Sequence, residues 1–298
     1  MPPEFLVAGH TVQDLIPDPA GAGPGWRLGG TASYAALVAK RLGLRTAVLT
    51  AAAPDLPLDE ALPAIDIVRA PSLRSTQFRN VYTAQGRVQY VQQRAATIDA
   101  TSLPADWRNA GIVLLGPVAG EVDDDLAGCF PQALIGVSAQ GWLRRVGPDA
   151  RVQPIPPESW QAEPVLRPAQ MLFVSDEDLP ASRAEPALVR WSAHVETLVF
   201  TRADRGAQVW HRGGWRHIDA FPANALDPTG AGDVFAAAYL IRYRETGDPW
   251  EAARFAACAA SFTVESVGLA GAPDREMIEA RLQEHPEIVC HPAKSAED

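Results

Sequence analysis

The first fifty residues alternate between apolar runs and a helical pattern, and this order strongly limits the fold. Residues 5–9 form a short apolar run ending in glycine, which predicts a buried strand. Residues 28–43 place apolar side chains at helical spacing between a glycine pair and Gly43, and residues 46–50 predict a second strand. Strand, helix and strand in this order form a βαβ unit, which implies a parallel sheet.

The α/β rhythm is interrupted once and then resumes. Residues 76–82 and 87–91 alternate between polar and apolar side chains around a glycine turn, which predicts a β-hairpin with one polar face. Further strands are expected at residues 112–115, 134–137, 171–174 and 197–201, a small hairpin at 208–210 and 215–217, and helices at 232–246 and 249–267. The Pro/Gly-rich stretch at 17–25 reads as a loop or short strand, and the polar tail from residue 286 is expected to be loosely ordered.

Composition narrows the class of protein. With 298 residues and a net charge of -10, the chain suits one large soluble α/β domain and not a nucleic-acid groove. Three scattered cysteines, no secretion signal and no run of 18 apolar residues favour a cytoplasmic protein without a membrane partner. No Cys/His spacing typical of a protein-only zinc site is evident.

One stretch of the sequence has the residues of a candidate catalytic site. Residues 227–233 read Asp-Pro-Thr-Gly-Ala-Gly-Asp and are followed by a small-residue apolar helix. The glycines let the backbone approach a ligand, and the N–H groups at the start of the helix form a seat for an anion such as phosphate. A carboxylate beside that seat, Asp233, suggests phosphoryl transfer to a hydroxyl. On its own the same pattern is also typical of an ordinary N-capped helix.

Two motifs nearly 200 residues apart give the chain a family resemblance. The Gly29-Gly30 pair with its alanine-rich helix, together with residues 227–233, resembles the ribokinase/PfkB family of sugar and nucleoside kinases. The resemblance covers residues 5–275. It implies a ribokinase-like three-layer α/β sandwich, with a doubly wound and mostly parallel sheet. It also implies a single domain, 1–298, with a small β lid made by segments 10–27 and 74–94.

The resemblance also implies roles for individual residues. Asp233 is expected to be the catalytic base, and Gly230, Ala231 and Gly232 the anion hole. Substrate-binding positions would be Asp14, Gly29, Gly30 and Tyr34. The nucleotide would lie by Thr201, Arg202, Gly206 and Ala257, and a monovalent cation, usually potassium, by Asp227, Thr229 and the loop at 268–272.

Several positions depart from the family pattern. Tyr34 stands where many members have asparagine, so it could stack on a ligand ring, close part of a sugar pocket or be a core aromatic. Thr31 stands where ribokinases often have lysine. Ser175 and Asp178 occupy the positions of the pattern that orders water around Mg²⁺, which leaves magnesium binding through Asp178 plausible but unsecured. Arg202 could pair with phosphate charge or be a solvated arginine.

The expected function is that of an ATP-dependent kinase that uses Mg²⁺, with K⁺ as the candidate monovalent cation. Its acceptor would be a sugar or polyol such as inositol, or else a nucleoside. A PfkB-fold protein that binds sugar or nucleotide without turnover is the alternative. A NAD-dependent enzyme is disfavoured because no glycine loop follows the first strand. A homodimer through the exposed edge of the lid hairpin is also expected.

Overall fold

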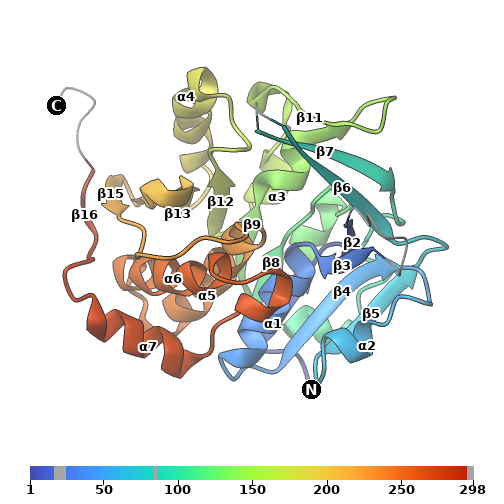
Figure 1. The fold of residues 1–298 in the computed structure, drawn as a ribbon, viewed down its shortest axis with the longest axis horizontal. Helices are drawn as coiled ribbons and strands as arrows, with labels where there is room; N and C mark the ends of the chain where they lie inside the picture. The colour runs from blue at the N-terminus through green and yellow to red at the C-terminus, as the bar shows by residue number, and fades with distance from the viewer. Residues whose placement is uncertain (17–24, 84–85, 294–298) are drawn as a thin grey trace.

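A large sheet with helices on both faces forms the body of the protein (Figure 1). The computed structural model describes residues 1–16, 25–83 and 86–293, so most of the expected loop at 17–25 lies outside it. The strand order is β16-β15-β14-β13-β12-β9-β8-β1-β4-β5. Its parallel strands are β1 (Phe5–Ala8), β4 (Thr46–Ala52), β5 (Asp66–Pro71), β8 (Ile112–Leu115), β9 (Leu134–Ser138), β12 (Met171–Ser175) and β13 (Thr197–Thr201).

The far end of the sheet is antiparallel. Strands β14 (Ala207–His211) and β15 (Gly214–Ile218) form the expected small hairpin beside β13. The tail was expected to be loosely ordered, and this is wrong for the part that the structure describes. There the short strand β16 (His291–Pro292) pairs with β15, because its backbone completes the free edge of that hairpin.

Along the strands of the large sheet, side chains point alternately into two separate hydrophobic cores, one on each face. In β1, Phe5 and Val7 pack into one cluster and Leu6 and Ala8 into the other, as the period of two requires. The first face is covered by α1 (Thr31–Arg41), α5 (Ala231–Thr246), α6 (Pro249–Val264) and α7 (Arg275–Glu284). The second lies under α3 (Glu163–Leu166) and α4 (Ala181–Ser192). The short α2 (Leu58–Ala61) follows β4. These are the three layers of the predicted sandwich.

Glycine sets how closely one helix approaches the sheet. A Cβ on Gly136 of β9 would lie 2.7 Å from Cδ1 of Leu240 in α5. That separation is shorter than side-chain carbons tolerate, so α5 lies close to the centre of the sheet only because this residue has no side chain.

A second sheet of four strands lies above one end of the body (Figure 1). Its order is β3-β2-β6-β7, with β2 (Val12–Leu15), β3 (Trp26–Gly29), β6 (Thr76–Thr83) and β7 (Gly86–Gln93). We call it the lid. Its outer strand β7 contacts an unpredicted hairpin, β10 (Arg144–Val146) and β11 (Val152–Pro154). The Val91 amide donates to the Ala150 carbonyl at 2.9 Å. The edge of the lid hairpin was expected to be exposed, but at Val91 it is bonded to the β10–β11 hairpin.

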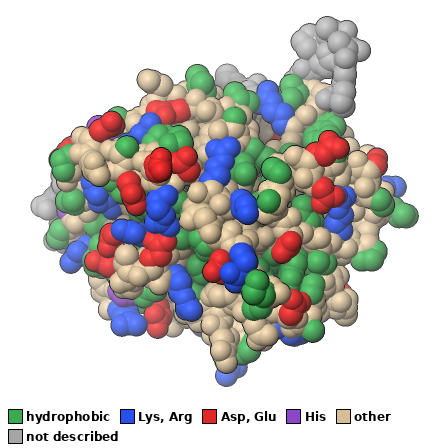
Figure 2. All heavy atoms as spheres, turned by 90° about the horizontal axis from the view of Figure 1, so that it is seen from below, with side chains coloured by type: hydrophobic (Ala, Val, Ile, Leu, Met, Phe, Trp, Pro, Cys, Tyr) green, Lys and Arg blue, Asp and Glu red, His purple; other side chains and the backbone are tan. Residues whose placement is uncertain are grey.

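The surface mixes charges of both signs. Figure 2 shows one face of the molecule, on which arginine and lysine side chains alternate with acidic ones and small apolar groups. Some of the charges are joined in ion pairs, such as Arg275 with Glu245 at 2.5 Å. No helix among the described residues is both long and apolar enough to cross a membrane.

Candidate active site

The turn before α5 has the geometry of an anion seat. Gly230 has a φ of 84°, in the left-handed region, and helix α5 starts at the next residue. The Thr229 amide donates to Oδ1 of Asp227 at 3.0 Å, and the Ala231 amide to the Pro228 carbonyl at 3.3 Å. Of the three residues expected to form the anion hole, Ala231 therefore has its amide engaged, whereas no described oxygen accepts from the amide of Gly230, Gly232 or Asp233. These three N–H groups at the start of the helix are available to an anionic ligand.

The ring of Tyr34 packs against this turn. It lies against Gly230, where any Cβ would overlap the ring. The side chain is only 2% exposed and belongs to the core on the α5 face of the sheet. Burial, and then the charges of Asp14, Asp227 and Asp233, raise the pKa of its hydroxyl. Of the readings that the sequence left open, the core aromatic fits best, and Tyr34 has little surface to offer a ligand ring.

The glycine pair brings the lid strand onto the start of α1. A Cβ on Gly29 would overlap the carboxylate of Asp14, which lies on β2. Gly30 has a φ of 86°, and a Cβ there would overlap the His10 carbonyl. The side chain of Asp14 is therefore held against the buried backbone of Gly29 at the base of the lid. Its charge also helps to raise the pKa of Asp233, so the two carboxylates share one site.

Asp233 lies in the first turn of α5 and is partly buried. Burial raises its pKa from 3.8 to about 6; Thr31 and Arg144 oppose the rise, whereas Asp178 and Asp14 add to it. The positive end of the helix favours the charged carboxylate, but the loss of solvent has the larger effect and the net pKa is raised. Such an acid is still mostly ionised at neutral pH and can accept a proton.

Thr31 reaches the same carboxylate from α1. The residue is 1% exposed, and its buried hydroxyl lies near enough to lower the pKa of Asp233, yet no hydrogen-bond partner for it is found among the described atoms. A buried hydroxyl with an unmet hydrogen bond is costly unless a ligand completes it. Position 31 is therefore suited to sharing an acceptor hydroxyl with Asp233.

Sequence reasoning missed Arg144 as a site residue. Its guanidinium contacts Oδ1 of the buried Asp178 at 3.1 Å and reaches Oε1 of Gln89 on lid strand β7 at 3.3 Å. Its charge also lowers the pKa of Asp233. Nothing local in the sequence predicts these contacts, because the partners lie 34 and 55 residues away.

The same contact changes the expectation for magnesium. Oδ1 of Asp178 is paired with Arg144, and Oδ2 accepts from the Ser175 amide at 3.3 Å. Burial raises the pKa of Asp178, and Arg144 opposes this. A carboxylate with both oxygens engaged does not fit well as the group that orders water around Mg²⁺.

A cavity of about 420 Å³ opens between the lid, the β10–β11 hairpin and the end of β12. Its walls are formed by Val88, Gln89, Leu143, Arg144, Arg151, Val152, Pro154, Glu177 and Asp178. Asp14 and Asp233 do not line it. Arg144 connects the cavity to Asp233, because it forms part of the cavity wall and its charge lowers the pKa of Asp233.

The expected nucleotide-side residues lie along one end of the β13–β15 region. Thr201 ends β13, and the Arg202 amide donates to the Gly206 carbonyl at 2.8 Å. Gly206 has a φ of 75° and lies against the backbone at Ile218, where a Cβ would overlap the carbonyl. Ala257 lies on α6, which packs against β14 and β15, and is 7% exposed.

The expected potassium site already has a cationic neighbour. The amides of Leu226 and Asp227 donate to the Val264 carbonyl, which ties the turn to the end of α6. Nη1 of Arg27 lies 4.0 Å from Oδ2 of Asp227. The side chain of Arg27 also passes Gly268, where a Cβ would lie 3.9 Å from its Cδ. Arg27 thus stands between the two segments expected to hold the cation, which weakens the fit to potassium.

Comparison with known proteins points to a kinase family. The family model for pfkB family carbohydrate kinases matches residues 150–275. A nucleoside kinase of Methanothermobacter thermautotrophicus is 47% identical over 51 residues, which cover 17% of this chain and 16% of that kinase. The matched segment thus spans about a sixth of that relative's length.

Two solved structures show the same fold over nearly the whole chain. One is a pyrophosphate-dependent kinase in the ribokinase family, complexed with a pyrophosphate analog and myo-inositol. It is 19% identical, with a TM-score of 0.76 over 93% of this chain and 99% of the other. The second is Arabidopsis thaliana ribokinase complexed with ribose and ATP. It is 19% identical, with a TM-score of 0.72 over 95% and 99% of the two chains.

Proposed function

We propose that this chain, which belongs to the pfkB family of carbohydrate kinases, transfers a phosphoryl group from ATP to a hydroxyl of a small sugar, polyol or nucleoside. One observation carries the proposal. A carboxyl group with a pKa of about 6, Asp233, stands in the first turn of α5 beside the Gly230 turn, where the Gly232 and Asp233 amides have no acceptor among the described residues. A base and an anion seat in contact are the two parts that phosphoryl transfer to a hydroxyl requires.

In the proposed mechanism, the amides of Gly232 and Asp233 hold the transferring phosphoryl group. Asp233 accepts the proton of the attacking hydroxyl, which becomes more acidic as its bond to phosphorus forms. Arg144 lies near enough to Asp233 to offset negative charge that builds up in the transition state. Magnesium would neutralise phosphate charge, but because Asp178 is engaged by Arg144, no step here depends on that ion.

The chemical class of the acceptor is proposed from the polar residues at the base of the lid. Asp14, held against Gly29, offers a carboxylate to ligand hydroxyls, and the buried Thr31 hydroxyl lies near Asp233. Paired hydroxyls of a sugar or of inositol would match this polar set, and a nucleoside is the second choice. The structural neighbour with bound myo-inositol supports the polyol reading and makes pyrophosphate a donor worth testing beside ATP.

The test is a matched pair of carboxamide variants. Asp233→Asn keeps shape but removes the base, so turnover should fall by at least about a hundredfold while donor binding by calorimetry is kept. Asp59→Asn is the control, because that carboxylate is exposed on α2, outside the site, and pairs only loosely with Arg69 at 3.8 Å. Release of ADP or phosphate is followed with sugars, inositols and nucleosides, using ATP or pyrophosphate as donor. Near-native turnover by Asp233→Asn would contradict the mechanism, and ligand binding without turnover by the native protein would favour the non-catalytic alternative.

A dimer through the lid stays a prediction. Part of the β7 edge is bonded to Ala150, and β3 forms the other edge of the lid sheet, so β3 is the second strand through which such a dimer could pair. Light scattering of the purified protein gives its mass directly. A monomer at all concentrations would contradict pairing through the lid.

A further inference from the structure

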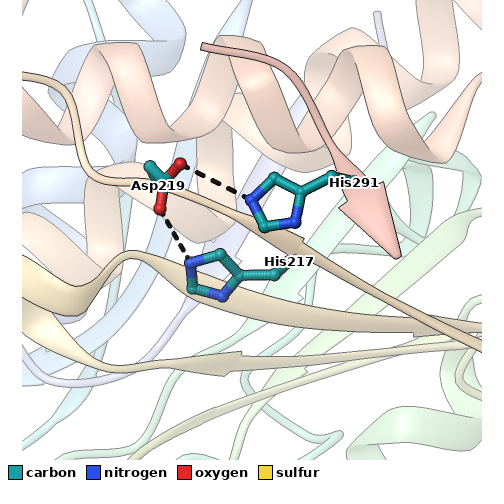
Figure 3. Close-up of side chains that lie close together, drawn as sticks. All are labelled: His217, Asp219 and His291. Carbon is teal, nitrogen blue, oxygen red and sulfur yellow. Dashed lines mark hydrogen bonds and ion pairs between the residues drawn. The ribbon is translucent and has the colours of Figure 1, made fainter. Parts of the chain in front are cut away.

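Three potential metal ligands converge at the edge of the large sheet, outside the site described above. His217 is on β15, Asp219 follows the end of that strand, and His291 is on β16 (Figure 3). One ligand atom from each lies within 4.8 Å of the other two. Nε2 of His217 lies 3.1 Å from Oδ1 of Asp219, and Nε2 of His291 lies 3.5 Å from Oδ2. In a tetrahedral zinc site, neighbouring ligand atoms are about 3.3 Å apart.

The strand register explains why these side chains meet. His217 and His291 are direct partners across the antiparallel pair β15–β16, so their side chains share one face. Asp219 lies two residues beyond His217 and returns to the same face. Cys290, next to His291, is engaged elsewhere, because its thiol donates to the Trp250 carbonyl at 3.4 Å. The set is therefore two imidazoles and one carboxylate, open to solvent on its remaining side.

A hydrogen bond of His291 favours a ligand orientation. Its Nδ1 lies 3.3 Å from the Pro292 carbonyl, and a carbonyl can only accept. With the proton on Nδ1, the neutral ring turns the Nε2 lone pair toward the carboxylate of Asp219. Two acceptors facing each other need a cation or a second proton between them. In metal sites, a carbonyl that holds the outer nitrogen in this way fixes the tautomer of a ligating histidine.

From this arrangement we propose that His217, Asp219 and His291 bind a divalent transition-metal cation of the zinc class. Two histidines and one carboxylate are a donor set that zinc accepts, with a fourth position left for water or another ligand. The ion would join β16 to β15 and so fasten the end of the described chain to the sheet. Asp219 follows Ile218, whose carbonyl lies against Gly206, so the ion would also lie close to the loop at 201–206.

The experiment uses tag-free, full-length protein stripped with a chelator, because a histidine tag would bind the probe. Co²⁺ is titrated in, its visible absorption is recorded, and Zn²⁺ is then added as competitor. We expect the bands of a four-coordinate site in the native protein. His217→Ala and His291→Ala should each bind at least about tenfold more weakly. His194→Ala removes an exposed histidine outside the cluster and should bind as the native protein does.

Two results would overturn the proposal. One is a native protein that gives no cobalt spectrum, and the other is a His291→Ala variant that binds as tightly as the native protein. Hydrogen exchange at residues 289–293, with and without Zn²⁺, adds a readout that does not depend on a variant folding: protection should rise on binding. Because neither measurement uses substrate, the outcome is independent of the proposed kinase activity.

Discussion

The ring of Tyr34 fills the space that a side chain at position 230 would need. Three of its ring carbons are the atoms that a Cβ on Gly230 would meet first. Helix α1 therefore sets the shape of the turn that opens helix α5, although the two residues lie almost 200 positions apart.

Gly230→Ala should unfold more easily than the native protein. The substitution costs about 1–2 kcal/mol for the left-handed backbone, and overlap with Tyr34 adds to this. Gly232→Ala is the matched control, because nothing lies within 4 Å of its Cβ position and its φ is not positive. Denaturant titration of both variants tests this. Equal stability of the two variants would show that Tyr34 does not constrain the turn.

The rate should fall with acid through the pKa of Asp233. A base with a pKa of about 6 is active when ionised, so kcat/KM should drop tenfold per pH unit below about 6 and level off above it. Arg144→Met removes a charge that lowers this pKa, so the acid limb should move upward by roughly half a unit or more. A pH profile that is the same in both proteins would show that Arg144 does not act on the base.

Asp233→Asn should make the protein more stable at neutral pH. The folded state raises the pKa of Asp233 from 3.8 to about 6, so the native carboxylate lowers stability once it ionises, by about 1–3 kcal/mol. The advantage of the variant should be absent below pH 4, grow between pH 4 and 6, and stay constant above pH 6. Urea titrations at pH 4, 5, 6 and 8 measure it. A variant less stable than the native protein at pH 8 would contradict the assigned pKa.

Potassium should have little effect on the native protein. The guanidinium of Arg27 lies 4.0 Å from Asp227 and already supplies positive charge there. Arg27→Gln removes that charge and keeps a polar side chain, so the ratio of rates in potassium and in a large organic cation should rise several-fold. A native protein that strongly depends on potassium would contradict a substitute role for Arg27.

Much of the body of the fold follows from short-range patterns. Apolar runs such as Ile112–Leu115 are buried on both sides, and the structure has strands at those positions. Glycines at 29, 30 and 230 indicated where the backbone closely approaches a neighbouring residue. These features are local, since each depends on a few adjacent residues.

The rest depends on contacts that no local pattern contains. Arg144 became a site residue because a hairpin carries it between Asp178 and Gln89. His217 and His291 meet only because the tail returns to the sheet as β16. The spacing of 74 residues between them resembles no familiar metal motif. The pKa of Asp233 likewise depends on burial by distant elements, which a helix-dipole argument omits.

The bond between Val91 and Ala150 has a mechanical consequence. A lid hinged only at its own base could swing freely, but this one is fastened at its outer strand to the hairpin that carries Arg144, and Gln89 holds the arginine itself. Any tilt of the lid must pull on that hairpin. In the proposed mechanism, an acceptor that moves the lid would therefore also move Arg144 and change the electric field at Asp233, so that acceptor binding and the pKa of the base are coupled.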